Sequence, residues 1–65
     1  MKAKLITQEE ADSIIETRDP RGLFYLESET GDGRKVIVGI DNQTGDAWTE
    51  DFKNKAACFR WLHDK

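Results

Sequence analysis

The sequence has few of the residues that staple small domains together or carry out catalysis. Its 65 residues include one cysteine, one histidine and one proline. Because Cys58 is the only cysteine, these residues can form neither an intramolecular disulfide nor a four-cysteine zinc site. We expect Cys58 to be a buried, reduced thiol, and such a thiol favours a cytoplasmic location over a secreted one.

Long apolar runs are also missing. Residues 1–7 carry basic charge but residues 8–10 are polar, so we expect neither a signal peptide nor a membrane anchor. The net charge of −3 suits a small protein in solution, and it is far from the dense basic surface of a nucleic-acid binder. The length leaves room for one small domain over residues 1–65, whose stability should be marginal.

A helix-capping signal precedes the first periodic block. Thr7 and Glu10 have the spacing of a capping box, in which each side chain accepts a hydrogen bond from the other residue's backbone N–H. Apolar residues then recur at helical spacing, at Ala11, Ile14 and Ile15. We predict a helix over residues 8–17, because Pro20 disfavours helical geometry in the residue before it. A short strand over residues 4–7 is an alternative addition ahead of this helix.

The middle of the chain has the pattern of a β-meander. Residues 23–28 are aromatic and extended in character, and residues 35–40 have the highest β-propensity in the chain. The polar loop between them, residues 29–34, contains two glycines, and together these segments predict a β-hairpin. A solvated turn over residues 41–45 should then lead to a third strand at residues 46–49.

The last block of the chain is helical in pattern. Thr49 is followed by two acids, which is typical of a helix start, and bases lie further along. On a helical wheel the apolar residues fall on one face: Phe52, Ala56, Cys58, Phe59 and Leu62. The elements predict an α+β fold of order α-β-β-β-α, a three-stranded antiparallel meander with both helices on one face. This arrangement is expected because we do not expect so small a sheet to carry a helix on each of its two faces.

Two tryptophans are the main candidate partner-binding residues. Trp61 falls outside the predicted core face, on the side of the helix that also carries Ala57, and an aromatic there is typical of an interface anchor. Trp48 and Ile37 are candidates because one face of the sheet is expected to stay open. In the alternative interpretation the helix packs in another direction and Trp61 is buried. The expected partner is another protein, or a second copy of the chain in a homodimer.

The titratable residues do not assemble a recognisable catalytic or metal-binding set. His63 has no serine or thiol that the sequence pairs with it, and Cys58 lacks an electropositive setting. Residues 41–46 invite comparison with a calcium loop, but Gln43 and Gly45 break the alternating pattern of oxygen ligands. We therefore expect no catalytic residue, no metal site and no cofactor.

The C-terminal part of the chain carries a family resemblance. Residues 40–52, followed by Trp61 and Leu62, resemble a pattern in short bacterial proteins, some of them carried by phages or other mobile elements. This resemblance, over residues 40–62, implies a bacterial, accessory setting, and it brings no activity, cofactor or catalytic residue with it. Together with the candidate residues it favours a cytoplasmic, non-enzymatic protein–protein interaction or regulatory module.

The order of elements also resembles the double-stranded RNA-binding domain, in which lysines at the start of the last helix contact phosphates. Lys53 and Lys55 are at the matching place in this chain. Acids precede them, and the loop at residues 29–34 carries acids as well, which opposes binding to phosphates. Nucleic-acid binding through Lys53 and Lys55 is therefore the alternative function.

Overall fold

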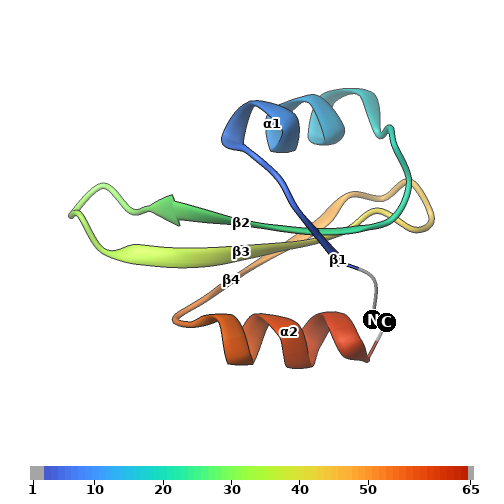
Figure 1. Ribbon diagram of the computed structural model, residues 1–65. Coiled ribbons are helices and arrows are strands. Elements are labelled where there is room, and N and C mark those ends of the chain that lie inside the picture. The colour runs from blue at the N-terminus through green and yellow to red at the C-terminus, as the bar shows by residue number, and fades with distance from the viewer. Residues whose placement is uncertain (1–2, 65) are drawn as a thin grey trace.

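The structure, a computed structural model, describes residues 3–64 and has one mixed sheet with two helices (Figure 1). Its elements in chain order are β1 (Ala3–Leu5), α1 (Gln8–Thr17), β2 (Leu23–Glu29), β3 (Lys35–Asp41), β4 (Trp48–Phe52) and α2 (Lys55–His63). The strands lie side by side in the order β1-β2-β3-β4. β1 runs parallel to β2, and the pairs β2–β3 and β3–β4 are antiparallel. The predicted α+β class is confirmed.

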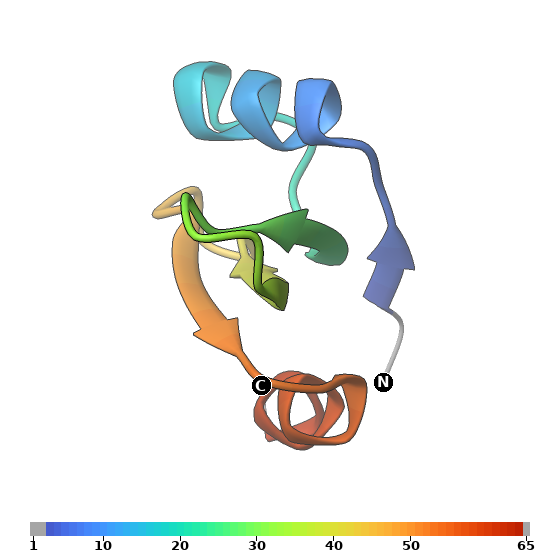
Figure 2. The same ribbon diagram turned by 90° about the vertical axis from the view of Figure 1, so that its left-hand side faces the viewer.

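The two helices cover opposite faces of the sheet, with α1 above and α2 below in Figures 1 and 2. Side chains alternate between the faces along β2 and β3. The face under α1 forms one apolar cluster, made of Ile6, Ala11, Ile14, Phe24, Leu26, Val38 and Ile40. The other face forms a second cluster with α2, which includes Leu23, Tyr25, Ile37, Cys58, Phe59, Trp61 and Leu62.

The prediction that both helices share one face is therefore wrong. Strands β2 and β3 carry apolar residues at consecutive positions, so both faces of the hairpin must be shielded from water and each takes a helix. The sheet is also wider than the predicted three-stranded meander. The additional strand, β1, was expected only as an alternative at residues 4–7, and it pairs with Leu23–Tyr25 of β2.

Helix α1 begins and ends where the local signals predict. The Oγ1 atom of Thr7 accepts a hydrogen bond from the Glu10 N–H at 3.2 Å, and Glu10 Oε1 accepts one from the Thr7 N–H at 3.2 Å. The helix ends at Thr17, and its C-cap is Arg18, whose backbone is left-handed with φ 61° and whose N–H donates to the Ile14 carbonyl at 2.7 Å. The capping box and the 8–17 range are thus confirmed.

The boundary between β4 and α2 differs from the prediction. The pattern at Thr49 resembles a helix cap, but pairing with β3 continues to Phe52, which lies opposite Ile37. The cap is Asn54, whose Oδ1 atom accepts a hydrogen bond from the Ala57 N–H at 2.9 Å. Phe52 therefore belongs to the sheet and Ala56 is exposed, so the prediction that these two residues lie on the core face of the helix is wrong, whereas Cys58 and Leu62 are buried there.

A buried asparagine joins the two loops at one end of the sheet. Asn42 is fully buried, so the turn expected to be solvated is instead anchored in the protein. Its Nδ2 atom donates to the Pro20 carbonyl at 2.8 Å, and its Oδ1 atom accepts from the Ala47 N–H at 3.1 Å. Its backbone exchanges two hydrogen bonds with Gly22, which completes its polar partners and ties the α1–β2 loop to the β3–β4 turn.

Replacing Asn42 by alanine should lower the free energy of unfolding by about 2 kcal/mol, because the Pro20 carbonyl and the Ala47 N–H then lose their partner. Urea denaturation measures this change. The neighbouring Gln43→Ala, at an exposed side chain, is the matched control and should change the free energy by less than about 0.5 kcal/mol. Equal effects at the two positions would show that the Asn42 side chain does not hold the loops together.

Candidate partner-binding surface

Strand β4 forms one border of the sheet (Figure 2). One side of the strand pairs with β3, and none of the described residues 3–64 pairs with the other side. Four of its residues are exposed and the last, Phe52, is half-buried. The strand is therefore held from one side and offers its outer side to solvent or to a partner.

The pairing pattern identifies which backbone groups of β4 face outward. Gly22 and Asn42 bond to each other in both directions, so even-numbered residues of β2 and β3 face one another. Odd-numbered residues of β3 consequently face β4, and they lie opposite Trp48, Glu50 and Phe52. The N–H and C=O groups of Thr49 and Asp51 therefore point away from the sheet.

An aromatic row runs along the α2 side of β4. Trp48 is 60 % exposed, and its Nε1 atom donates to Glu50 Oε1 at 3.3 Å. Phe52, on the same face of the strand, contacts Trp61 of α2 with ring centroids 5.6 Å apart. Side chains at alternate positions of a strand share a face, so a large exposed indole, a carboxylate and a half-buried phenyl ring follow one another here.

Trp61 lies mainly within the protein. It is half-buried and packs in the cluster between α2 and the sheet. Its ring lies over Gly39, where an added Cβ would be 3.0 Å from Trp61 Cζ3. This is the alternative interpretation of the sequence, in which the helix packs in another direction. Ala57 lies half-buried in the first turn of α2.

The structure places the other two candidates differently from each other. Trp48 is exposed as predicted, although both faces of the sheet carry a helix. Ile37 is buried against α2 at 8 % exposure, so the prediction that it lies on an open face is wrong. The physical reason is that α2 covers the face on which Ile37 lies. Of the predicted partner-binding residues, Trp48 is therefore the one with a mostly exposed side chain.

Acidic side chains accompany the outer edge of β4. Glu50 and Asp51 are both exposed, and neither forms a salt bridge with another of residues 3–64. Alternation places their side chains on opposite faces of the strand. A segment lying along this edge would therefore meet one carboxylate on each of its faces.

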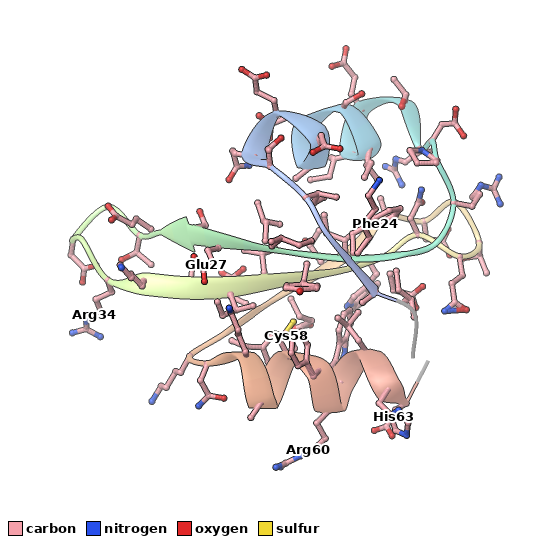
Figure 3. All side chains as sticks on the ribbon, viewed as in Figure 1. Phe24, Glu27, Arg34, Cys58, Arg60 and His63 are labelled. Carbon is pink, nitrogen blue, oxygen red and sulfur yellow. The ribbon has the colours of Figure 1, made fainter. Side chains whose placement is uncertain are left out.

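The titratable residues considered for catalysis do not come together. Cys58 is fully buried and points from α2 toward the sheet, whereas His63 is exposed at the end of the same helix (Figure 3). Burial raises the pKa of the Cys58 thiol, which disfavours the reactive thiolate. Within residues 3–64, no three His, Cys, Asp or Glu side chains are grouped as metal ligands would be.

The lysines of the alternative function are exposed at the start of α2. Lys55 Nζ lies 3.3 Å from Glu27 Oε1, so an acid of the hairpin partly neutralises it. Lys53 directly follows β4, two residues after Asp51 and three after Glu50. The described part of the chain contains no helix with the length and apolar character needed to cross a membrane.

A hollow of about 420 Å³ lies along the end of the β2–β3 hairpin. Five of its seven lining residues are polar or charged; the seven are Gln8, Glu27, Ser28, Glu29, Lys35, Val36 and Ile37. These residues include no histidine or cysteine, and their acids and one base do not form a set that assigns a nucleophile, a base and a charge stabiliser. The open edge of β4 is the better candidate surface.

Comparison with protein-family models, with curated proteins and with solved structures found no match to this chain.

The two tryptophans should respond differently to truncation. We expect Trp61→Ala to lower the free energy of unfolding by about 2–4 kcal/mol, because the indole fills space between α2, Phe52 and Gly39. Trp48→Ala should lower it by less than about 1 kcal/mol, since that ring is mostly exposed. Urea unfolding followed by circular dichroism compares them. A larger loss from Trp48→Ala would contradict the assignment.

Cys58 should make stability fall at alkaline pH. Since burial raises the pKa of its thiol, the folded protein holds this proton more tightly than the unfolded chain does. The resulting stabilisation is complete below the ordinary thiol pKa and is lost as the pH rises from that value through the raised one. The free energy of unfolding of the native protein should then fall more steeply with pH than that of Cys58→Ala. Parallel slopes would contradict the prediction.

Proposed function

We propose that the chain is a small non-enzymatic protein–protein interaction module, and that the outer edge of β4 with Trp48 is the surface it offers. The observation that carries this proposal is the combination of outward-facing backbone groups at Thr49 and Asp51 with an exposed indole beside them. Addition of a strand to such an edge is a common mode of protein recognition, and exposed tryptophans are frequent interface anchors.

Within the described residues the sheet has two open edges, and β4 fits the proposed surface better than the far end of β2 does. Strand β1 covers β2 only as far as Tyr25, so the far end of β2 is also unpaired among the described residues. That segment lacks an exposed aromatic side chain, and its Glu27 is engaged with Lys55. Edge strands are usually protected by shortness, proline or charge. In β4 the protection comes from Glu50 and Asp51 alone.

The charge distribution supports a protein partner over the nucleic-acid alternative. Lys55 pairs with Glu27, and the carboxylates of Glu50 and Asp51, which form no salt bridge within residues 3–64, lie three and two residues before Lys53. The phosphate backbone of a nucleic acid approaching this region would meet those carboxylates. Their repulsion offsets the free energy gained when the nucleic acid releases its counterions. The bacterial or mobile-element setting, and a regulatory role within it, belong to the same proposal. They are supported by the resemblance of residues 40–62, a range that contains β4 and Trp61.

Proline substitutions in β4 test the surface. Thr49→Pro removes an outward-facing N–H and leaves the pairing with β3 intact, so the fold should be retained while strand addition is blocked. Peptides selected from a displayed random library on the native protein should bind Thr49→Pro and Trp48→Ala at least about tenfold more weakly, a loss of about 1.4 kcal/mol. Fluorescence anisotropy measures the affinities.

Two controls accompany this experiment. Arg60→Ala changes an exposed side chain that points away from the sheet and should bind the selected peptides normally (Figure 3). Glu50→Pro removes an N–H that faces β3 and should destabilise the fold by about 3 kcal/mol. Selected peptides that bind all the folded variants equally would show that β4 is not the recognition surface.

A further inference from the structure

We propose that the outer edge of β4 binds an extended, basic segment of another protein, which adds to the sheet as a further strand. This inference rests on the proposed function, because it names the chemistry of the partner for the same surface. It is carried by three features of β4: its outward backbone groups, the placement of its two carboxylates, and the exposed ring of Trp48.

The backbone of β4 offers hydrogen bonds to an extended partner. The N–H and C=O groups of Thr49 and Asp51 point outward in the plane of the sheet, as the pairing of β3 with β4 requires. Adjacent strands lie about 4.8 Å apart, and an extended segment at that spacing can satisfy donors and acceptors of both residues. A helix cannot do so, because its own backbone groups are bonded internally.

The charges of β4 select a basic segment. Glu50 lies on the α2 side of the strand and Asp51 on the other, so an incoming strand meets a carboxylate on each of its faces. The side chains of that strand alternate too, and two consecutive Lys or Arg residues could each lie opposite one carboxylate. Opposite charges at paired positions contribute about 0.2–1 kcal/mol each. Asp46, exposed just before β4, extends the acidic character toward the turn.

The aromatic row favours arginine over lysine in the partner. Trp48 and Glu50 share the α2 side of the strand and are joined by a hydrogen bond of 3.3 Å. A guanidinium placed opposite Glu50 can pair with the carboxylate and stack on the neighbouring indole at once. An ammonium has no flat face to stack. The partner segment is thus expected to place arginine on the α2 side, next to apolar side chains that contact Trp48 and Phe52.

The same charges disfavour a second copy of the chain as occupant. Antiparallel pairing of two β4 strands through their outward-facing residues places Glu50 opposite Glu50 when Thr49 pairs with Asp51, and Asp51 opposite Asp51 when Asp51 pairs with its copy. Like charges directly opposite each other are destabilising. Pairing of β4 with the open part of β2 in another copy is also disfavoured by like charges, because that segment carries Glu27 and Glu29. The net charge of −3 adds a further repulsion between copies.

Synthetic peptides with the length of an ordinary strand, about six residues, test this proposal. One labelled peptide carries two consecutive arginines flanked by valines, and matched peptides carry lysine or glutamate in place of arginine. Fluorescence anisotropy with the native protein should show binding in the order arginine, lysine, glutamate, with the first weakened by salt. Amide hydrogen exchange should slow at Thr49 and Asp51 when the arginine peptide is bound. If the glutamate peptide binds as tightly as the arginine peptide, the proposed preference for a basic segment is wrong.

Charge-matched variants separate a specific site from net charge. Glu50→Lys should weaken binding of the arginine peptide at least about tenfold. Glu9→Lys makes the same change in net charge in the first turn of α1, which lies on the β1 side of the sheet (Figure 2), and should have little effect. Equal losses from the two variants, or binding without slower exchange at Thr49 and Asp51, overturn the proposal. The proposal is also overturned if sedimentation shows that the native protein is a dimer and that Thr49→Pro abolishes the dimer.

The two proposals fail in different ways. If library-selected peptides depend on Thr49 and Trp48 but are acidic or neutral, the recognition surface stands and the basic partner is wrong. If neither the selected peptides nor the arginine peptide depends on Thr49, the recognition surface itself is wrong.

Discussion

The central hairpin of β2 and β3 carries apolar side chains on both faces, and water must be excluded from each. Phe24, Leu26 and Ile40 require one cover, and Tyr25 with Ile37 requires another. The chain meets this requirement with a helix from each side of the hairpin in sequence: α1 before it and α2 after it. Since α1 and α2 are both used on the faces, neither lies against the outer edge of β4. The exposed edge is thus a consequence of how the hairpin is shielded (Figure 2).

Much of the fold could be predicted where the signals are local. The capping box of Thr7 and Glu10 set the start of α1, and the β-branched run in β3 predicted the hairpin, because these patterns act over a few residues. The start of α2 was missed because Thr49 and Asn54 both resemble caps, and only the pairing of Phe52 with Ile37 in the sheet distinguishes them. Strand β1 is short, and its parallel partner is distant in sequence, so no local pattern reveals the pairing.

The candidate site was predicted in part, and its residues show why. The exposure of Trp48 followed from its place in a border strand, although the expected reason, an uncovered face, does not hold. Trp61 was misplaced because the wheel counted Phe52 and Ala56 as core residues of the helix, whereas Phe52 belongs to β4, Ala56 is exposed and Trp61 packs against Phe52. Asn42 was read as a solvated turn residue because asparagine is common in turns, and its burial depends on the loop that contains Pro20. Contacts between distant segments decide all three.

The way β4 is anchored explains where a partner would add. Its first end is fixed by the Asn42 side chain, which binds the Ala47 N–H directly before the strand. Its last end is fixed by the contact of Phe52 with Trp61, and that contact needs Gly39 because a side chain there would meet the indole. Between these anchors, Thr49, Glu50 and Asp51 are exposed and held mainly by the ladder to β3. A strand added on the outer side would pair with this central part. Its backbone hydrogen bonds would stabilise β4 most there, because only β3, among the described elements, pairs with these residues.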